Sequence, residues 1–377
     1  MSLSVLHTAV TALSPHDLTA ADLDAGVALG EIGKIARTDL SAWARAIDEG
    51  TYPATLLHRF ADAGAFRLHL SQGHQLGNAI EGMSRVSEVC AATGFMAWCQ
   101  NTLVWYLINS ENEAPRAKYL AAVATGHVLG GTALSNPMKS FFGIETLKLK
   151  GTRVEGGYKV RGILPWVSNL GPDHFFGCIF AVDGAAPVMA IIDCAEPAVT
   201  LKPCEPFLGM DGTGTYAVQV RDLFIPDDMV LAHDAMSFVK KMRAGFILLQ
   251  AGMAIGLIRD CIAMMREVEE PLGHVNRYLD VQPDQMAETL AAMEAEVNTL
   301  AETPFDPSPD YWRRVVSARL LAGEKSVEAA HYAMLHCGAR GYVRASRCQR
   351  RLREAYFVAI VTPATKQLKL MLDQMPA

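Results

Sequence analysis

The chain has 377 residues, of which half are apolar and 20% are charged, and its formal net charge is -6. This length exceeds one small domain and provides material for a large buried core. The 34 basic residues are dispersed along the chain, which argues against nucleic acid or an anionic membrane as a partner. No basic segment followed by a sustained apolar segment opens the chain, and no segment reaches the ~18 uninterrupted apolar residues of a spanning helix. We therefore expect a cytoplasmic protein.

Cysteine and histidine patterns give no support for a metal site. The eight cysteines include no CxxC pair and lie mostly in apolar surroundings, so we expect reduced core thiols. The eleven histidines form no HExxH or comparable ligand spacing.

Residues 21–126 have apolar side chains at intervals of three and four, which predicts helices. Small residues alternate with Trp98 and Trp105 in the segment 79–108, a pattern typical of helices packed inside a protein. We interpret both indole rings as core packing. The first predicted unit is a helical domain over residues 1–127.

From about Gly130 the pattern changes to short runs of Val, Ile, Phe and Thr separated by turn residues. These runs predict a β domain over residues 128–232. The pair Gly156–Gly157 separates two alternating segments and predicts a two-residue hairpin in which both glycines have positive φ.

After Pro226 the helical pattern returns and predicts a bundle over residues 233–377. The apolar segment 245–258 suits a helix buried inside the bundle or between subunits, and Pro363 suits the first turn of the last helix. The order of helices, strands and helices predicts a multi-domain α+β protein. The helices are expected at 238–268, 283–302, 311–337, 346–361 and 363–374.

The chain contains, in this order, the segments GGTALSNP (130–137), GILPWVSN (162–169), 207–231 and 337–362. Together these segments resemble the acyl-CoA dehydrogenase superfamily, which includes related flavin-dependent monooxygenases. GGTALSNP (130–137) is similar to a segment that ends in Thr-Glu-Pro, with Ser135 at the threonine and Asn136 at the glutamate. GILPWVSN (162–169) resembles Gly-x-Lys-x-Trp-Ile-Thr-Asn, with Trp166 and Ser168 at the Trp and Thr. Residues 207–231 resemble the exit to the C-terminal bundle. CGARGYVRASRCQRRLREAYFVAIVT (337–362) resembles Gly-Gly-x-Gly-Tyr followed by Arg-Asp-Ala.

The resemblance implies a fold and a cofactor. The fold has an N-terminal all-α domain, a central antiparallel β-barrel or sandwich and a C-terminal four-helix bundle. The cofactor is FAD, or alternatively FMN, and the partners are a small-molecule substrate such as a CoA thioester and a second or further copy in a homodimer or homotetramer. By this resemblance the flavin-binding residues are Leu134, Ser135, Trp166 and Ser168 at the ring, and Gly338 and Gly341 near the cofactor of a neighbouring subunit.

The sequence departs from the family pattern at the position of the catalytic base. Removal of the α-proton of an acyl thioester requires a carboxylate base. The family position of this glutamate holds Thr362, and the alternative position on the first long helix of the bundle holds Phe246. Another base would have to act, and the candidates are Glu354, Asp211 and His336.

Three hypotheses follow. The first is a flavin-dependent dehydrogenase-like oxidoreductase that acts on an acyl-CoA-like substrate by hydride transfer to flavin N5. The second is a two-component monooxygenase that receives reduced flavin from a flavin reductase and needs a dry apolar pocket and a donor rather than a base. The third is a non-catalytic member that keeps the fold for binding or assembly.

Overall fold

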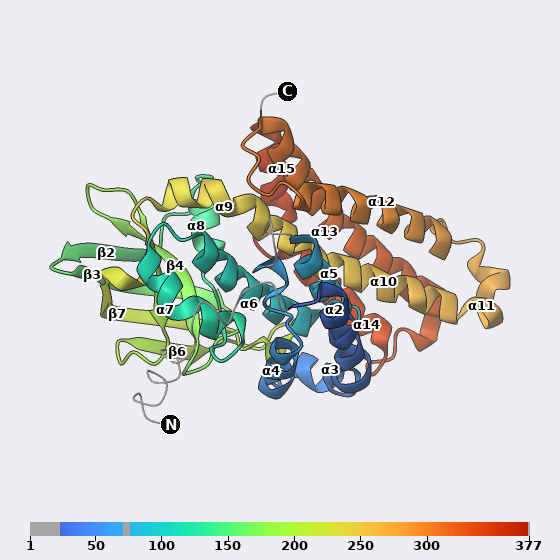
Figure 1. Cartoon of the computed structure of the whole chain (residues 1–377). Helices are drawn as coiled ribbons and strands as arrows, with labels where there is room; N and C mark the ends of the chain where they lie inside the picture. The colour runs from blue at the N-terminus through green and yellow to red at the C-terminus, as the bar shows by residue number, and fades with distance from the viewer. Residues whose placement is uncertain (1–22, 71–75, 376–377) are drawn as a thin grey trace.

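The computed structural model describes residues 23–70 and 76–375. Helices occupy the N-terminal third, a sheet the middle and further helices the C-terminal part, as the sequence predicts. Figure 1 shows the sheet at one end of the molecule, the C-terminal helices at the other, and α6 between them. The N-terminal helices are α2 (Ala25–Ile35), α3 (Ser41–Asp48), α4 (Ala54–Asp62), α5 (Leu76–Ser87), α6 (Ala91–Asn109) and α7 (Glu113–Ala124).

Helix α6 forms the centre of the core. All of its residues except Ile108 are buried. The Trp105 indole N–H donates to the Met242 carbonyl at 3.0 Å, and the Trp98 indole N–H lies 3.4 Å from the Phe246 carbonyl. The interpretation of both tryptophans as core residues is confirmed, because each ring fills the interior and still satisfies its polar atom.

The middle of the chain forms one mainly antiparallel sheet with the order β6-β7-β3-β2-β4-β5-β8. Strand β1 pairs in parallel with β4 and is off this path. The short strands β6 and β8 and the helix α8 (Ser135–Ser140) were not predicted. The strands are β1 (Gly130–Thr132), β2 (Leu149–Val154), β3 (Gly157–Val167), β4 (Phe175–Val182), β5 (Val188–Asp193), β6 (Val199–Pro203), β7 (Tyr216–Pro226) and β8 (Val230–Ala232).

The predicted hairpin joins β2 to β3, but its turn differs by one residue. Val154 pairs with Gly157, so the two turn residues are Glu155 and Gly156. Only Gly156 has positive φ, at 73°. Gly157 belongs to β3 and is needed for another reason, because a Cβ there would lie 2.2 Å from the Ile225 carbonyl oxygen of β7. The prediction that both glycines have positive φ is wrong.

Two details of the predicted C-terminal helices also differ. The helix expected at 238–268 is divided at Gln250, and Pro363 precedes the last helix by two residues because Val361 and Ala364 have extended backbones. The helices are α9 (Ala235–Leu249), α10 (Ala251–Glu267), α11 (Glu269–Asn276), α12 (Pro283–Ala301), α13 (Pro309–Cys337), α14 (Arg347–Ile360) and α15 (Thr365–Asp373).

The segment formed by α9 and α10 is long and apolar. By length and composition alone, Ala235–Glu267 could cross a membrane, but 89% of its most apolar window is buried inside the structure. It therefore serves as a core helix, in agreement with the expectation that residues 245–258 are buried.

Candidate functional site

Two of the segments singled out in the sequence lie side by side. A Cβ on Gly131 of β1 would lie 2.1 Å from the Ser168 carbonyl oxygen, and the Asn169 side-chain amide donates to the Gly130 carbonyl at 2.6 Å. The glycine therefore permits close contact between the backbone of β1 and that of the segment after β3. This contact brings GGTALSNP and WVSN together, as the resemblance implies.

Trp166 presents an exposed aromatic face next to this contact. Its side chain is 63% exposed and its backbone has φ +55°. The register between β3 and β7 shifts between Leu164 and Val167, so the strand bulges at the tryptophan. An exposed tryptophan in the left-handed region is uncommon, and here it offers a flat apolar surface with no internal partner ring among those recorded for the described residues.

Ser168 lies in a short chain of hydroxyl groups. Its Oγ shares a hydrogen bond of 2.7 Å with Thr215 Oγ1, which in turn shares one of 2.8 Å with Thr213 Oγ1. Asn169, which has φ +60°, accepts a hydrogen bond of 2.7 Å from the Tyr52 hydroxyl at its side-chain oxygen. The loop after β3 is therefore fixed from both sides before any ligand binds.

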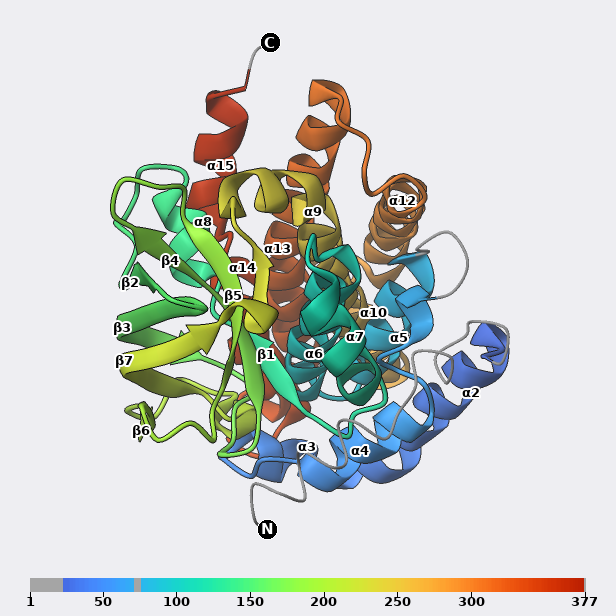
Figure 2. The same ribbon diagram turned by 60° about the vertical axis from the view of Figure 1, so that its left-hand side comes forward.

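The central polar contact of the candidate site joins Ser135 to Thr362. Their hydroxyl oxygens lie 2.8 Å apart and share a hydrogen bond, although 227 residues separate them. Thr362 is buried, and the side chain of Gln367, on α15, donates to the Met138 carbonyl of α8 at 3.1 Å. Figure 2 shows α8 next to α15. Thr362 thus contacts Ser135, one of the residues predicted to bind the flavin.

A buried arginine holds the loop that carries Thr362. Arg319 is fully buried and donates to the Gln250 side-chain oxygen and to the Val358 carbonyl, each at 2.6 Å. The Gln250 side-chain amide donates to the Thr362 carbonyl at 2.9 Å. All partners of this guanidinium are neutral, and burial lowers the pKa of Arg319 to about 10. Neither Arg319 nor Gln250 stands out in the sequence.

Phe246, at the predicted alternative base position, belongs to an aromatic cluster. Phe246 is buried and packs edge-on against Trp98, with ring centroids 5.2 Å apart. Phe95 stacks on Trp98 at 5.6 Å and meets Phe357 of α14 at 4.6 Å. Five residues beyond Phe357 the chain reaches Thr362. The surroundings of Phe246 are therefore aromatic.

Glu354 is a buried ion-pair residue, not a free base. One carboxylate oxygen accepts from Arg350 at 3.0 Å and from the Ala91 backbone N–H at 3.2 Å, and the other accepts from Arg351 at 2.7 Å. Arg351 also binds Asp260 at 2.5 Å. The network joins α14 to the start of α6 and to α10.

The other two candidate bases also have structural partners. Asp211 accepts the backbone N–H of Phe207 at 2.8 Å within its own loop. His336 is buried, its Nε2 lies 3.0 Å from the Val281 carbonyl, and its own carbonyl accepts from Asn276. Neither side chain is recorded in contact with Ser135 or Thr362.

The predicted glycine positions lie apart from the hydroxyl pair. Gly338 ends α13 with φ +58°, a conformation that favours glycine. Gly341 packs against side chains of its own loop region, because a Cβ there would lie 3.0 Å from Cys337 Cβ and 3.3 Å from Cys348 Cβ. Among the described residues, neither glycine is recorded in contact with Ser135 or Trp166.

Comparison with known proteins identifies the arrangement. No family model matches the chain. It is 24% identical over 349 residues to the isovaleryl-CoA dehydrogenase of Oryza sativa subsp. japonica, covering 86% of this chain and 84% of that protein. The butyryl-CoA dehydrogenase of Megasphaera elsdenii superposes with a TM-score of 0.81 at 16% identity and covers 93% of this chain and 98% of its own. The dibenzothiophene monooxygenase of Paenibacillus sp. A11-2 gives 0.76 at 14% identity with the same coverage.

The chain belongs to the acyl-CoA dehydrogenase-like superfamily. Its architecture is mixed α+β, and helices precede and follow a mainly antiparallel sheet in the sequence. This is the fold of these proteins.

The described residues fit the ring of a flavin, the cofactor of this superfamily. Trp166 provides a planar apolar face that is uncovered in the folded chain. Ser135 lies at the start of α8 and Ser168 beside β1, so hydroxyl donors flank the same region. A hydroxyl both donates and accepts, and each serine can keep its present partner while it binds a polar edge of the ring.

Proposed function

We propose that this protein is a flavin-dependent oxidoreductase with FAD as its cofactor. Trp166 would cover one face of the ring, and the backbone at Leu134 together with Ser135 and Ser168 would hold its polar edge. A bound flavin supplies a two-electron acceptor or donor. The surrounding residues supply binding, orientation and exclusion of water. The substrate would lie beside Thr362 and the aromatic cluster of Phe95, Trp98, Phe246 and Phe357.

The reaction that this geometry supports best is oxygen-dependent oxidation of an apolar substrate. The observation that supports it is the hydrogen bond between the neutral hydroxyls of Ser135 and Thr362, because the resemblance predicts the carboxylate base of a dehydrogenase at the position of Thr362. Among the described residues, no carboxylate is recorded in contact with either hydroxyl. Neutral donors in an apolar site suit a monooxygenase, which also implies a flavin reductase as partner.

The second candidate is dehydrogenation of an acyl-CoA-like substrate. Its support is the similarity to isovaleryl-CoA dehydrogenase over 86% of the chain. This reaction would require a base from outside the hydroxyl pair, since Thr362 cannot remove a weakly acidic α-proton unaided. The homodimeric or homotetrameric state and the cytoplasmic location also stay predictions.

Absorption spectroscopy of the full-length protein tests the proposal. We expect flavin bands near ~370 and ~450 nm after addition of FAD. Anaerobic addition of acyl-CoA thioesters should leave the bands unchanged, and aerobic addition of reduced flavin with an aromatic substrate should give oxygen uptake coupled to product. Loss of the flavin bands on anaerobic addition of a thioester would favour dehydrogenation over oxygen-dependent oxidation. Absence of flavin binding in either redox state would refute both and favour the non-catalytic alternative.

A further inference from the structure

Arg243 of α9 is a half-buried cation that has an aromatic partner but no acidic one. Its guanidinium lies over the indole ring of Trp312 on α13, with 3.7 Å between the guanidinium carbon and the ring centroid. Burial lowers the pKa of Arg243, and no carboxylate opposes this effect. Among the described residues, no ion pair and no hydrogen bond of this side chain is recorded. The stacked guanidinium is therefore held in place while its N–H groups stay free.

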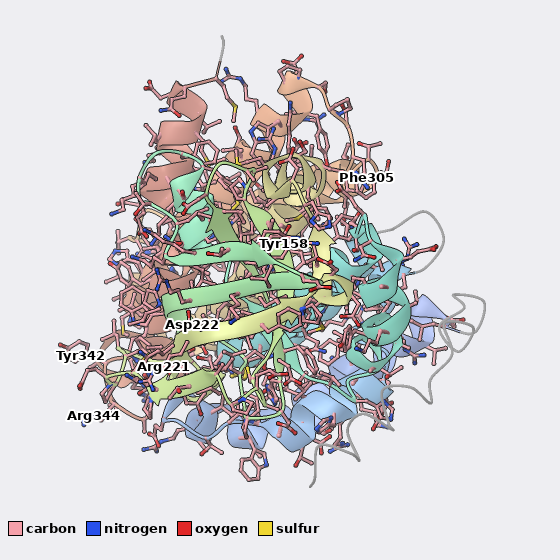
Figure 3. The ribbon with its side chains drawn as sticks, turned by 90° about the vertical axis from the view of Figure 1, so that its left-hand side faces the viewer. Tyr158, Arg221, Asp222, Phe305, Tyr342 and Arg344 are labelled. Carbon is pink, nitrogen blue, oxygen red and sulfur yellow. The ribbon has the colours of Figure 1, made fainter. Side chains whose placement is uncertain are left out.

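Two other arginines show what is unusual about this one. Burial also lowers the pKa of Arg319, but its guanidinium donates to neutral oxygens of neighbouring residues. Arg153 also lies over an aromatic ring, that of Tyr158 on β3, which is labelled in Figure 3, but it forms an ion pair with Asp227. Arg243 combines stacking with partial burial and lacks the acceptor that each of these residues has.

The free edge of Arg243 can be reached by a ligand. No nitrogen of this side chain belongs to the fully buried side-chain atoms that lack a hydrogen-bond partner, so its donors are not enclosed by protein. A guanidinium presents parallel N–H groups that match the two oxygens of a carboxylate. Neither Arg243 nor Trp312 lies in the segment 338–346, whose glycines are predicted to approach a neighbouring subunit.

Arg243 lies one helical turn before Phe246 on the same side of α9. One turn corresponds to about 5 Å along the helix axis. Phe246 packs against Trp98 in the aromatic cluster beside which we propose that the substrate lies. The Trp105 indole fixes the backbone of α9 at this point, because it donates to the Met242 carbonyl at 3.0 Å. The cation and the aromatic cluster are therefore neighbours on one fixed helix.

Trp312 links the same position to the helices that approach Ser135. It packs against an apolar cluster that includes Leu368 of α15 and Phe142, which follows α8. Helix α8 begins at Ser135. Figure 2 shows α8, α9 and α15 together in the upper part of the view. The guanidinium therefore lies near the junction of α8, α9, α13 and α15, at the edge of the candidate site.

We propose that Arg243 binds a carboxylate group of the substrate and that the protein acts on an aromatic acid whose ring packs against the cluster around Phe246. The inference rests on the proposed function for the place of the substrate and adds its chemical class. A bound carboxylate neutralises the cation and fills its free edge, while Trp312 keeps the guanidinium plane fixed. A separation of about one helical turn suits an acid in which one or two carbon atoms join the ring to the carboxylate.

Isothermal titration calorimetry of the full-length protein without added flavin tests the proposal. The probes are phenylacetate and its neutral isostere phenylacetamide. We expect phenylacetate to bind about 10-fold or more tightly than the amide, because hydrogen bonds to a charged group are the stronger ones. Arg243→Met should remove this preference and leave the affinity for phenylacetamide unchanged, which also shows that the variant is folded. Arg243→Lys should keep part of the preference, because lysine retains the charge but not the paired donors.

Arg277→Met is the matched control. Arg277 also lies over an aromatic ring, that of Tyr278 at 5.0 Å, but both residues are exposed. This variant should bind both probes like the wild type.

Three results would overturn the proposal. The first is equal affinity of the wild type for the two probes, or failure of both to bind. The second is an unchanged preference for phenylacetate in Arg243→Met. The third is binding of coenzyme A, but not of phenylacetate, that depends on Arg243, since this would assign the residue to a phosphate group.

The titration is independent of the absorption test for flavin. Flavin binding without a preference for the acid would refute this inference and leave the proposed function intact. A preference for the acid that depends on Arg243, without flavin binding in either redox state, would refute the proposed function and leave the carboxylate site intact.

Discussion

Replacement of Glu354 by glutamine separates a structural role from a catalytic one. The carboxylate is fully buried and receives donors from Arg350, Arg351 and the backbone of Ala91. The glutamine side chain carries no charge, and its NH₂ group would face at least one of these donors, with which it cannot form a hydrogen bond. Breaking a buried ion pair on one side costs about 3–5 kcal/mol. We expect a loss of this size in the free energy of unfolding, measured by chemical denaturation.

Glu324→Gln is the matched control. Glu324 pairs with Lys369 at 2.8 Å, but both side chains are about half exposed. An exposed pair contributes about 0–1 kcal/mol, so this variant should unfold like the wild type. If Glu354→Gln kept wild-type stability and flavin binding but lost turnover, Glu354 would be the missing base and the structural interpretation would be refuted.

Three further predictions concern the site and its loop. Thr362→Glu places a carboxylate at the family's base position, so thioester-dependent flavin bleaching should appear, about 100-fold or more above wild type and above Thr362→Gln. Trp166→Ala should weaken flavin binding by about 3- to 10-fold in a fluorescence titration, corresponding to ~0.5–1.5 kcal/mol of ring contact, while Trp166→Phe retains most of it. Burial lowers the pKa of His174, whose Nδ1 lies 3.0 Å from the Asn169 carbonyl beside the site. As the pH falls, the unfolded chain binds the proton before the folded chain does. The stability contributed by neutral His174 is therefore present above about pH 6.5 and is lost as the pH falls through the folded pKa. His174→Asn should flatten this part of the curve of unfolding free energy against pH.

The elements were predictable from the sequence because their signals are local. Helical periodicity and alternating strands extend over adjacent residues, so the order of helices, sheet and helices follows from the chain itself. The segments around Trp166 and Ser135 were also recognisable, since each contains several residues of a family pattern. The exact turn of the hairpin was not, because Gly157 is required by contact with β7, which lies far away in the sequence.

The polar contacts of the site were not predictable for the same reason. Ser135 and Thr362 are 227 residues apart, and Gln250 and Thr362 are 112 residues apart. Nothing in the sequence distinguishes Arg319 from the other basic residues of α13. Its importance appears only when the folded chain buries it against carbonyl oxygens. Single-sequence reasoning predicted that Thr362 and Phe246 stand at the family's base positions, but the contacts of these two residues appear only in the folded chain.

Two acids on the segments that carry the hydroxyl pair, Glu145 and Glu354, are held by other partners. Asn136 follows Ser135, and its side-chain amide donates to Glu145 at 3.0 Å. The same carboxylate binds Lys139 at 3.0 Å and lies 3.7 Å from Lys148, and although burial opposes the change, these hydrogen bonds and charges lower the pKa of Glu145. A carboxylate held by two lysines is a weak base. Glu354 is held by two arginines. A dehydrogenase reaction that used Glu145 or Glu354 as its base would therefore have to break an existing ion pair, whereas a reaction that uses Ser135 and Thr362 as neutral donors needs no rearrangement of charge.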